Sequence, residues 1–295
     1  MNNGEIKLVG LIGWPVKHSL SPVIHNSAFD VLGLNWRYIP FAVHPSKVGI
    51  AVQGLAALGF RGVNVTAPHK QSVMASLTWI TPDAAPIGAV NTLVFGRTED
   101  GETEVRGYNT DGLGFINALL EGGFRLQKNH QVLVIGAGGA ARAVIYSLLE
   151  VGVDEIYILN RSLERGRKLV KDFSNLTLGK KQLHILPLNS KTLLEYTHSA
   201  DLLVNTTPVG TWPDCSVSIW PENTAIPSHL TVFDLVYNPI ETHLLKKARI
   251  SQVPVISGLE MLIHQAGLSF ELWTGVSAPL NVMRTAAKAA LKMAI

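Results

Sequence analysis

The chain is 295 residues long and 47% hydrophobic, and its 25 Lys and Arg against 22 Asp and Glu give a net charge of +3. This length exceeds the size at which one hydrophobic core usually stops growing, so we expect two domains. The balanced charge excludes the strongly basic surface of a protein that binds nucleic acid or a membrane, but leaves small anionic ligands open. With a single cysteine, Cys215, and no run of roughly 18 apolar residues, we expect a cytoplasmic protein without disulfides or membrane spans.

The first third of the chain alternates short apolar runs rich in β-branched residues with longer amphipathic stretches. The pattern predicts strands at 9–12, 38–43 and 62–65 and helices at 23–32 and 48–58. Such a βαβα alternation is typical of a mostly parallel sheet covered by helices. A turn-rich segment, 107–112, then precedes a helix over 113–120 with Asp111 as its N-cap, and we place the first domain boundary after residue 110.

A second alternating series begins at residue 131. It predicts strands at 131–135, 155–159, 184–186, 202–205 and 231–235, with a helix that ends at Leu149. From about residue 258 the pattern is helical, over 259–272 and from 279 to the end, and we expect these two helices to pack back on the first domain. The predicted organisation is an α/β chain with one discontinuous domain, 1–110 and 258–295, and a second domain at 111–257.

The most specific motif is an apolar strand, a glycine turn and a helix start in immediate succession at 132–143. Gly136 would allow the tight turn, Gly138 would let a pyrophosphate approach the backbone, and the small Ala141 would let helix and strand pack closely. The helix N-terminus favours an anion. We therefore predict a Rossmann-like domain whose dinucleotide site includes Gly136, Ala137, Gly138, Gly139 and Ala140; the alternative is a purely structural turn.

The residues at the end of the next strand indicate which nicotinamide cofactor is used. An NAD enzyme commonly has an acid there, whereas this chain has Asn160, Arg161 and Ser162, followed closely by Arg165. A guanidinium can pair with the 2′-phosphate of NADP, which a carboxylate would repel. The pattern favours NADP; the alternative is a solvated basic helix face.

The first domain contains two candidate substrate-binding segments. Ser21 before Pro22 predicts a helix start with Ser21 as N-cap, and Ser19 on the same loop could converge with it on a carboxylate. Lys70 lies just beyond a strand in a segment short of other charges. It could serve as general base for an alcohol or general acid for a ketone. A structural cap and an ordinary exposed lysine are the alternatives.

Two polar clusters in apolar surroundings contain Asn91 and Asp111. An amide and a carboxylate can bind vicinal hydroxyls, and an aspartate beside Lys70 would hold it in place and share its proton. A turn residue and a helix cap are the alternatives. The spacing of the histidines matches no metal site, so we assign no metal ligand.

Taken together, these motifs resemble the shikimate dehydrogenase family, from about Gly10 to Gly275. The matching segments are 19–22, 64–70, 88–92, 109–112, 136–141, 160–162, 205–208 and 258–273. Each segment is weak evidence alone, but their order is hard to imitate. The resemblance implies an NADP-dependent oxidoreductase that reversibly reduces 3-dehydroshikimate to shikimate in the biosynthesis of chorismate and the aromatic amino acids.

The resemblance also implies roles for individual residues. The catalytic pair would be Lys70 and Asp111, and no metal is required. The substrate carboxylate would be held by Ser19, Ser21 and Tyr237, and its hydroxyls by Thr66, Asn91, Asp111 and Gln265. Thr206 and Gly258 would join the cofactor site. His264 stands where the family often has Gln, and we interpret it as a surface or packing residue because adjacent helical positions do not share a face.

Two rival functions remain open. A quinate/shikimate dehydrogenase could accept a broader substrate range or NAD, although Asn160 and Arg161 argue against NAD. A non-catalytic ligand sensor of the same fold should have lost the lysine or aspartate, and this chain keeps both. The sequence leaves a monomer and a symmetric homodimer equally open.

Overall fold

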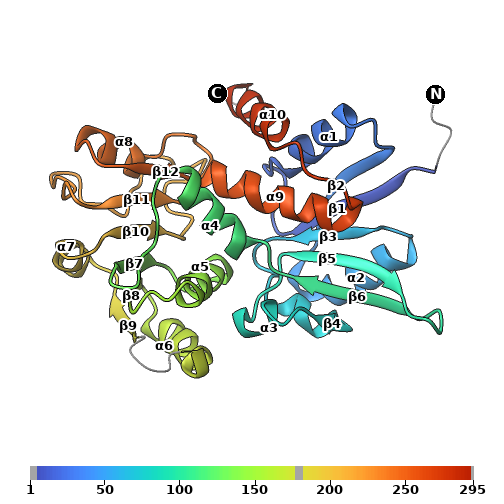
Figure 1. The fold of residues 1–295 in the computed structure, drawn as a ribbon, viewed down its shortest axis with the longest axis horizontal. Helices are drawn as coiled ribbons and strands as arrows, with labels where there is room; N and C mark the ends of the chain where they lie inside the picture. Colours follow the sequence, from blue (N-terminus) through green and yellow to red (C-terminus); the bar gives the residue numbers. More distant parts are fainter. Residues whose placement is uncertain (1–4, 177–181, 294–295) are drawn as a thin grey trace. The chain divides into compact units, whose positions relative to one another are not determined.

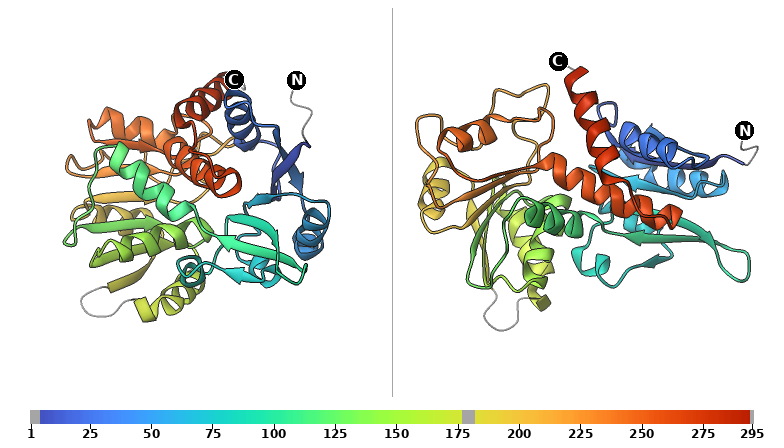
Figure 2. Two further views of the ribbon diagram at one scale, coloured as in Figure 1. Left: turned by 45° about the vertical axis from the view of Figure 1, so that its right-hand side comes forward. Right: turned by 45° about the horizontal axis from the view of Figure 1, so that its top comes forward.

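A computed structural model describes residues 5–176 and 182–293 (Figures 1 and 2). It divides into two compact units, of which the first contains the residues up to Asp111 and from Ile263 onward, and the second contains Gly112–Leu262. Within the described residues, each unit is built on one six-stranded sheet flanked by helices. The α/β class predicted from the sequence is confirmed.

The sheet of the first unit has the order β2-β1-β3-β5-β6-β4. Its strands are β1 (Lys7–Gly13), β2 (Trp36–Ala42), β3 (Gly62–Val65), β4 (Trp79–Ile80), β5 (Thr92–Arg97) and β6 (Thr103–Tyr108), and the helices between them are α1 (Ser21–Val31), α2 (Val48–Ala57) and α3 (Ala84–Ile87). β1 pairs in parallel with β2 and β3, and β4 with β6, whereas β5 runs antiparallel to both β3 and β6. The sheet is therefore mostly parallel, as predicted, but it contains an antiparallel hairpin that the periodicity did not reveal.

The C-terminal helices complete the first unit. α9 (Gly258–Thr274) belongs to this unit from Ile263 onward, and α10 (Leu280–Met293) packs against α1 (Figure 1). On α9, Phe270 stacks on Phe29 of α1 at 5.2 Å between ring centroids, and Trp273 Nε1 donates a hydrogen bond to the Leu93 carbonyl of β5 at 3.0 Å. The predicted return of the C-terminal helices to the first domain is confirmed.

The contact between Trp273 and the sheet depends on a glycine. A Cβ on Gly62 would overlap the Leu93 carbonyl oxygen and the Trp273 indole nitrogen. We expect Gly62→Ala to lower the free energy of unfolding by roughly 1–3 kcal/mol, because backbone and indole must both shift. Gly54→Ala is the matched control: its Cβ meets no atom within 4 Å at an exposed position of α2, so it should raise stability by roughly 0.5–1 kcal/mol. Urea unfolding measures both, and equal stability of the two variants would contradict the account.

The second unit has a wholly parallel sheet. Its strands are β7 (Gln131–Ile135), β8 (Glu155–Asn160), β9 (Gln182–Pro187), β10 (Leu202–Asn205), β11 (Thr231–Asp234) and β12 (Val255–Ser257), and its helices are α4 (Asp111–Glu121), α5 (Gly139–Glu150), α6 (Leu163–Asp172), α7 (Ser190–Thr197), α8 (His243–Ile250) and the start of α9. The strand order is β12-β11-β10-β7-β8-β9. This is the doubly wound Rossmann order, in which the direction of strand addition reverses between β7 and β10.

β7 is buried on both faces because its side chains alternate between two cores. Val132 and Val134 pack in a cluster with Phe115 of α4 and Val144 of α5, whereas Leu133 and Ile135 pack in a separate cluster that includes residues of α7 and α8. A central parallel strand covered by helices on both sides reads as a continuous apolar run, which is how this one was found in the sequence. No helix among the described residues has both the length and the apolar surface needed to span a membrane.

Candidate active site

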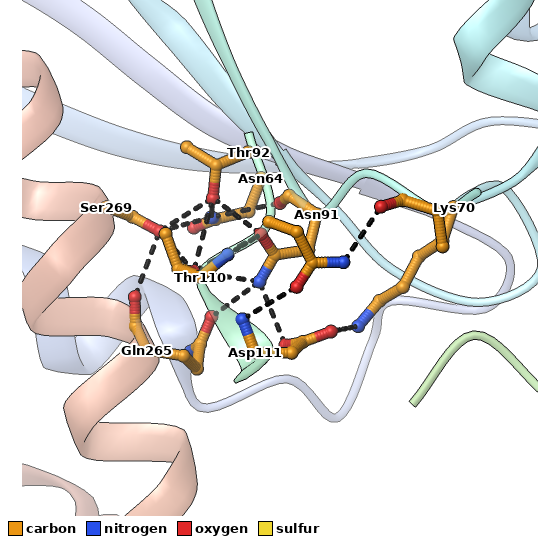
Figure 3. A network of polar contacts seen from close by, with 10 residues as sticks. Asn64, Lys70, Asn91, Thr92, Thr110, Asp111, Gln265 and Ser269 are labelled. Atoms are coloured by element: carbon orange, nitrogen blue, oxygen red, sulfur yellow. Dashed lines mark hydrogen bonds and ion pairs between the residues drawn. The ribbon is translucent and has the colours of Figure 1, made fainter. Parts of the chain in front are cut away.

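An ion pair between Lys70 and Asp111 lies in the first unit (Figure 3). Lys70 follows β3, and Asp111 is the first residue of α4; Lys70 Nζ lies 2.5 Å from Asp111 Oδ2. The two side chains are 18% and 6% exposed, so little water screens the pair. A lysine held beside a carboxylate in this way is arranged to hold and release a proton at a defined position.

Asn91 holds the other oxygen of the aspartate. Asn91 Nδ2 donates to Asp111 Oδ1 at 2.9 Å, and Asn91 Oδ1 accepts from the backbone N–H of Thr110 at 2.8 Å. Because a backbone N–H only donates and a carboxylate only accepts, the orientation of the amide is determined. Gln265 Oε1 of α9 also lies 3.4 Å from Asn91 Nδ2, so four predicted site residues, Lys70, Asn91, Asp111 and Gln265, form one group.

Two predicted N-caps are wrong. α4 begins at Asp111 itself, whose N–H donates to Asn109 Oδ1 at 3.0 Å while its carboxylate binds Lys70 and Asn91. α1 begins at Ser21 with no side-chain cap, and Ser19 Oγ accepts from the Ser21 N–H at 3.2 Å. In both cases the side chain two residues upstream satisfies the backbone donor. The Asp111 carboxylate is thereby left for contacts at the site.

The remaining predicted substrate residues lie in other segments. Ser19 and Ser21 follow β1, and Thr66 follows β3, so all three come from the same edge of two adjacent parallel strands. Thr66 reaches over the end of β1, where a Cβ on Gly13 would overlap its methyl group. Tyr237 is half-buried in the second unit, in the segment after β11, and burial raises the pKa of its phenol. His264 is half-buried on α9.

The glycine turn after β7 has the features that a dinucleotide needs. Gly136 has a φ of 113°, and a Cβ there would lie 2.6 Å from Thr206 Oγ1, which itself donates to the Ile135 carbonyl at 2.7 Å. A Cβ on Gly138 would meet no atom within 4 Å, and α5 begins after it without a side-chain cap. The turn thus combines a position that requires glycine with an open backbone face at an uncapped helix N-terminus, which fits a bound pyrophosphate.

The end of β8 carries the predicted cofactor-specificity residues. Asn160 Nδ2 donates to the Ser162 carbonyl at 2.8 Å, and Ser162 Oγ accepts from the Arg165 N–H at 3.3 Å as N-cap of α6. Capping uses an acceptor of the Ser162 hydroxyl and leaves its proton for a ligand. Arg161 and Arg165 are exposed. Ala137, Gly139 and Ala140 lie in the turn and the first turn of α5, and Gly258 begins α9, where a Cβ would overlap the backbone of Leu235.

Asp234 at the end of β11 is a buried carboxylate that the sequence analysis did not single out. Its oxygens accept from Asn205 Nδ2 at 2.9 Å, the Val236 N–H at 3.1 Å and Thr242 Oγ1 at 2.6 Å. Asn205 Oδ1 in turn accepts from the Thr207 N–H and hydroxyl. The carboxylate therefore connects the turns after β10 and β11. Burial raises the pKa of Asp234 from 3.8 to about 6, although the three hydrogen bonds act in the opposite direction.

The raised pKa of Asp234 predicts a pH-dependent stability. Between about pH 4 and about pH 6 the folded state keeps a proton that the unfolded state has lost, so ionisation of Asp234 lowers the free energy of unfolding as the pH rises. The difference between wild type and Asp234→Asn should fall by on the order of 2–3 kcal/mol over this range. Urea unfolding at several pH values tests this. Asp30→Asn, at a carboxylate that is 64% exposed, is the control. A difference in the free energy of unfolding between wild type and Asp234→Asn that does not change with pH would refute the prediction.

Four further polar side chains surround the Lys70 and Asp111 pair but received no role from the sequence: Asn64, Thr92, Thr110 and Ser269. All are at most 5% exposed. Ser269 Oγ lies 2.9 Å from Asn64 Nδ2 and 2.8 Å from Thr92 Oγ1 (Figure 3). A polar residue inside an apolar run was the available signal for Asn64, and the spacing of four residues from Gln265 on one helix face was the signal for Ser269.

A Rossmann unit with a dinucleotide turn, together with a unit that carries a buried Lys–Asp pair, is typical of a nicotinamide-dependent dehydrogenase. Family models match three segments of the chain: the shikimate dehydrogenase substrate binding domain at residues 11–93, shikimate / quinate 5-dehydrogenase at 119–211, and the shikimate 5'-dehydrogenase C-terminal domain at 258–288.

Whole-chain comparisons agree with these matches. The chain is 43% identical over 283 residues to the shikimate dehydrogenase (NADP(+)) of Desulforamulus reducens, which covers 96% of this chain and 94% of that protein. A crystal structure of shikimate dehydrogenase in complex with NADP+ superposes with a TM-score of 0.87 at 39% identity, covering 99% and 98% of the two chains. The Thermus thermophilus enzyme in complex with NADP(H) and shikimate gives 0.82 at 36% identity, covering 96% and 99%. The chain belongs to the shikimate dehydrogenase family.

Proposed function

We propose that this protein is a shikimate dehydrogenase, which reversibly reduces 3-dehydroshikimate to shikimate with NADPH in chorismate and aromatic amino acid biosynthesis. The Lys70–Asp111 pair carries the proposal, because it places a proton donor and its carboxylate partner at 2.5 Å in the unit that contains the match to the family's substrate binding domain. We further infer that residues 1–110 and 258–295 form the substrate domain and residues 111–257 the NADP domain.

In the reductive direction NADPH, when bound, supplies a hydride to the ketone carbon. Lys70 Nζ gives a proton to the carbonyl oxygen as negative charge develops there, and takes it back in the oxidative direction. Asp111 holds the ammonium through Oδ2 and is itself held by Asn91 through Oδ1. The Lys70–Asp111 pair thus supplies the proton, and bound NADPH the hydride, that together convert the ketone to an alcohol.

Binding of the substrate is proposed to divide between its carboxylate and its hydroxyls. Ser19, Ser21 and Tyr237 would hold the carboxylate; both serines stand at the start of α1, where the backbone N–H groups and the helix dipole favour an anion. Thr66, Asn91, Asp111 and Gln265 would bind the hydroxyls. Asn91 and Asp111 are buried, and their mutual hydrogen bond sets the direction in which each offers its remaining donors or acceptors.

Binding of NADP is proposed to use the two strand ends of the second unit. The pyrophosphate would lie on the turn from Gly136 to Ala140 at the start of α5. Thr206 and Gly258, which follow β10 and β12, would join the cofactor site, with Thr206 toward the nicotinamide. The exposed Arg161 and Arg165, with Asn160 and Ser162, would bind the 2′-phosphate, which supports NADP over NAD. A cytoplasmic location is also part of the proposal and is supported by the single Cys215.

The test is absorbance at the reduced nicotinamide band, with shikimate or quinate and with NADP or NAD. Rapid turnover with shikimate and NADP is expected. Turnover of quinate, or with NAD, would replace the proposal by the broader quinate/shikimate dehydrogenase, an activity that one of the matched family models includes. Absence of turnover in all four combinations would favour a ligand sensor.

The role of Lys70 predicts a specific kinetic change. Lys70→Ala should lower kcat by about 10²- to 10⁴-fold, because the proton donor is lost, while the Kd of shikimate changes much less. Steady-state kinetics and equilibrium binding measure the two effects. Lys47→Ala removes an exposed lysine of the same unit and should leave kcat unchanged. Near-normal turnover of Lys70→Ala would rule out the role.

The role of Arg161 predicts a change in cofactor preference. Arg161→Ala should raise the KM for NADP by roughly 10- to 100-fold, because a charge-assisted hydrogen bond to the 2′-phosphate is lost. It should change the KM for NAD little. Arg167→Ala on the helix that follows, also exposed, is the control and should change neither. An equal loss for both cofactors in Arg161→Ala would remove the argument for a phosphate clamp.

A further inference from the structure

We propose that Tyr38, Asn64 and Thr92 are positioning residues that form, with Asn91, a one-way chain of hydrogen-bond donors ending on the Asp111 carboxylate. This inference rests on the proposed function, because Asp111 is taken there as the partner of the proton donor. None of the three residues is expected to touch substrate or cofactor; each acts through the next.

The chain runs through three strands of the first unit. Tyr38 Oη of β2 donates to Asn64 Oδ1 of β3 at 2.8 Å, and Asn64 Nδ2 donates to Thr92 Oγ1 of β5 at 3.0 Å. Thr92 Oγ1 donates to Asn91 Oδ1 at 3.0 Å, and Asn91 Nδ2 donates to Asp111 Oδ1 at 2.9 Å (Figure 3 shows the part from Asn64 onward). Every donor in the series points toward Asp111.

Neighbouring backbone groups determine the direction of the chain. The Thr110 N–H donates to Asn91 Oδ1, so the Asn91 NH2 must face the carboxylate. Asn64 Nδ2 lies 3.2 Å from the Asn91 carbonyl oxygen, which only accepts, so the Asn64 oxygen must face Tyr38. With both amides oriented, the Thr92 hydroxyl accepts from Asn64 and donates to Asn91, which leaves the Ser269 hydroxyl at 2.8 Å to donate to Thr92. A hydroxyl can do both through a single atom.

The chain is sealed from water. Tyr38, Asn64, Thr92, Asn91 and Asp111 are 3%, 5%, 0%, 2% and 4% exposed, so water cannot easily replace a lost donor. In such surroundings successive hydrogen bonds polarise one another, and an unpaired group is costly. The Asn91 N–H is therefore a stronger donor to Asp111 than an isolated amide would be, and the carboxylate is held with Oδ2 toward Lys70.

The far end of the chain is anchored without charge. The Tyr38 ring stacks on His25 at 4.5 Å between centroids with 3° between the planes. His25 is fully buried, and neither ring nitrogen has a hydrogen-bond partner among the described residues. Burial lowers the pKa of His25 to about 3, so the ring is neutral at ordinary pH. Tyr38 is thus fixed by an aromatic contact, and its hydroxyl proton is committed to Asn64.

Ser269 provides a matched comparison, because it lies beside the chain. Its hydroxyl contacts Asn64 Nδ2, Thr92 Oγ1 and Thr110 Oγ1 and can donate to the Gln265 carbonyl at 3.0 Å. It is a side branch, because the links from Tyr38 through Asn64, Thr92 and Asn91 to Asp111 are complete without it. It is as fully buried as Thr92. Removing the Ser269 hydroxyl tests the loss of a buried hydroxyl, and removing that of Thr92 tests the loss of the link.

The decisive variant is Thr92→Val, which removes the hydroxyl and nearly keeps the shape. It should lower kcat by about 5- to 20-fold with less than about threefold change in either KM, because a positioning contact is lost and not a binding one. The solvent isotope effect on kcat should increase as proton transfer becomes more rate-limiting. Thr92→Ser should restore both, and Ser269→Ala should stay within about threefold of wild-type kcat. Equal losses in Thr92→Val and Ser269→Ala would overturn the proposal.

A second measurement does not depend on activity. In protein labelled with [13C]aspartate, the carboxyl signal of Asp111 is identified as the one lost in Asp111→Asn. The chain predicts that this signal moves in both Thr92→Val and Tyr38→Phe and moves less in Ser269→Ala. Tyr38→Phe also serves if Thr92→Val fails to fold. An unmoved signal in both variants refutes the donor chain, whereas inactive wild-type protein with a signal that moves refutes only the proposed dehydrogenase activity.

Discussion

A buried ion pair that must be held from several sides organises the first unit. Lys70 and Asp111 leave most of their hydration on folding, and such a pair is tolerated only when its remaining donors and acceptors are satisfied. Asn91 satisfies the second carboxylate oxygen, and its own oxygen is satisfied by the backbone of Thr110. The antiparallel β5 is what brings Asn91 to this place, because that residue immediately precedes the strand.

α9 closes this arrangement from the opposite end of the sequence. Ser269 and Gln265 of α9 contact Thr92 and Asn91 at the start of β5. Trp273 donates a hydrogen bond to the Leu93 carbonyl of β5, at a position where Gly62 leaves room for the indole. The helix therefore contributes to the polar network and to the apolar core of the same unit. Because α9 makes both polar and apolar contacts in this unit, it could not shift along the sheet without breaking hydrogen bonds among buried groups.

In the second unit, the main structural requirement is that backbone N–H groups are exposed at the end of a buried strand. β7 packs both faces in apolar cores, and the chain must then turn sharply at Gly136 against Thr206, which follows the neighbouring strand. Asp234 stabilises the adjoining turns through Asn205 and Thr242. The rigid surroundings leave one face of the turn open at Gly138, as a phosphate site requires.

The sequence predicted the strands that are buried on both faces and the helices whose amphipathic pattern extends over several turns. The runs at 131–135 and 202–205 coincide with β7 and β10, because continuous apolar character over so short a length is typical of a strand that is buried on both faces. The hairpin of β5 and β6 escaped notice, because Thr92, Glu104 and Arg106 interrupt its apolar pattern. The helix starts were misassigned at Ser21 and Asp111, because cap chemistry and site chemistry use the same residue types.

By itself, the sequence determined the family and the α/β class, and it predicted the glycine turn and the pairing of Lys70 with Asp111, since each depends on local order along the chain. Only the tertiary structure decided that Asn91 faces the carboxylate with its nitrogen, that Ser269 lies beside Thr92, and that Tyr38 begins a series of donors. These facts join residues up to 177 positions apart. The direction of a hydrogen bond depends on which groups surround it in space, and local pattern carries no record of that.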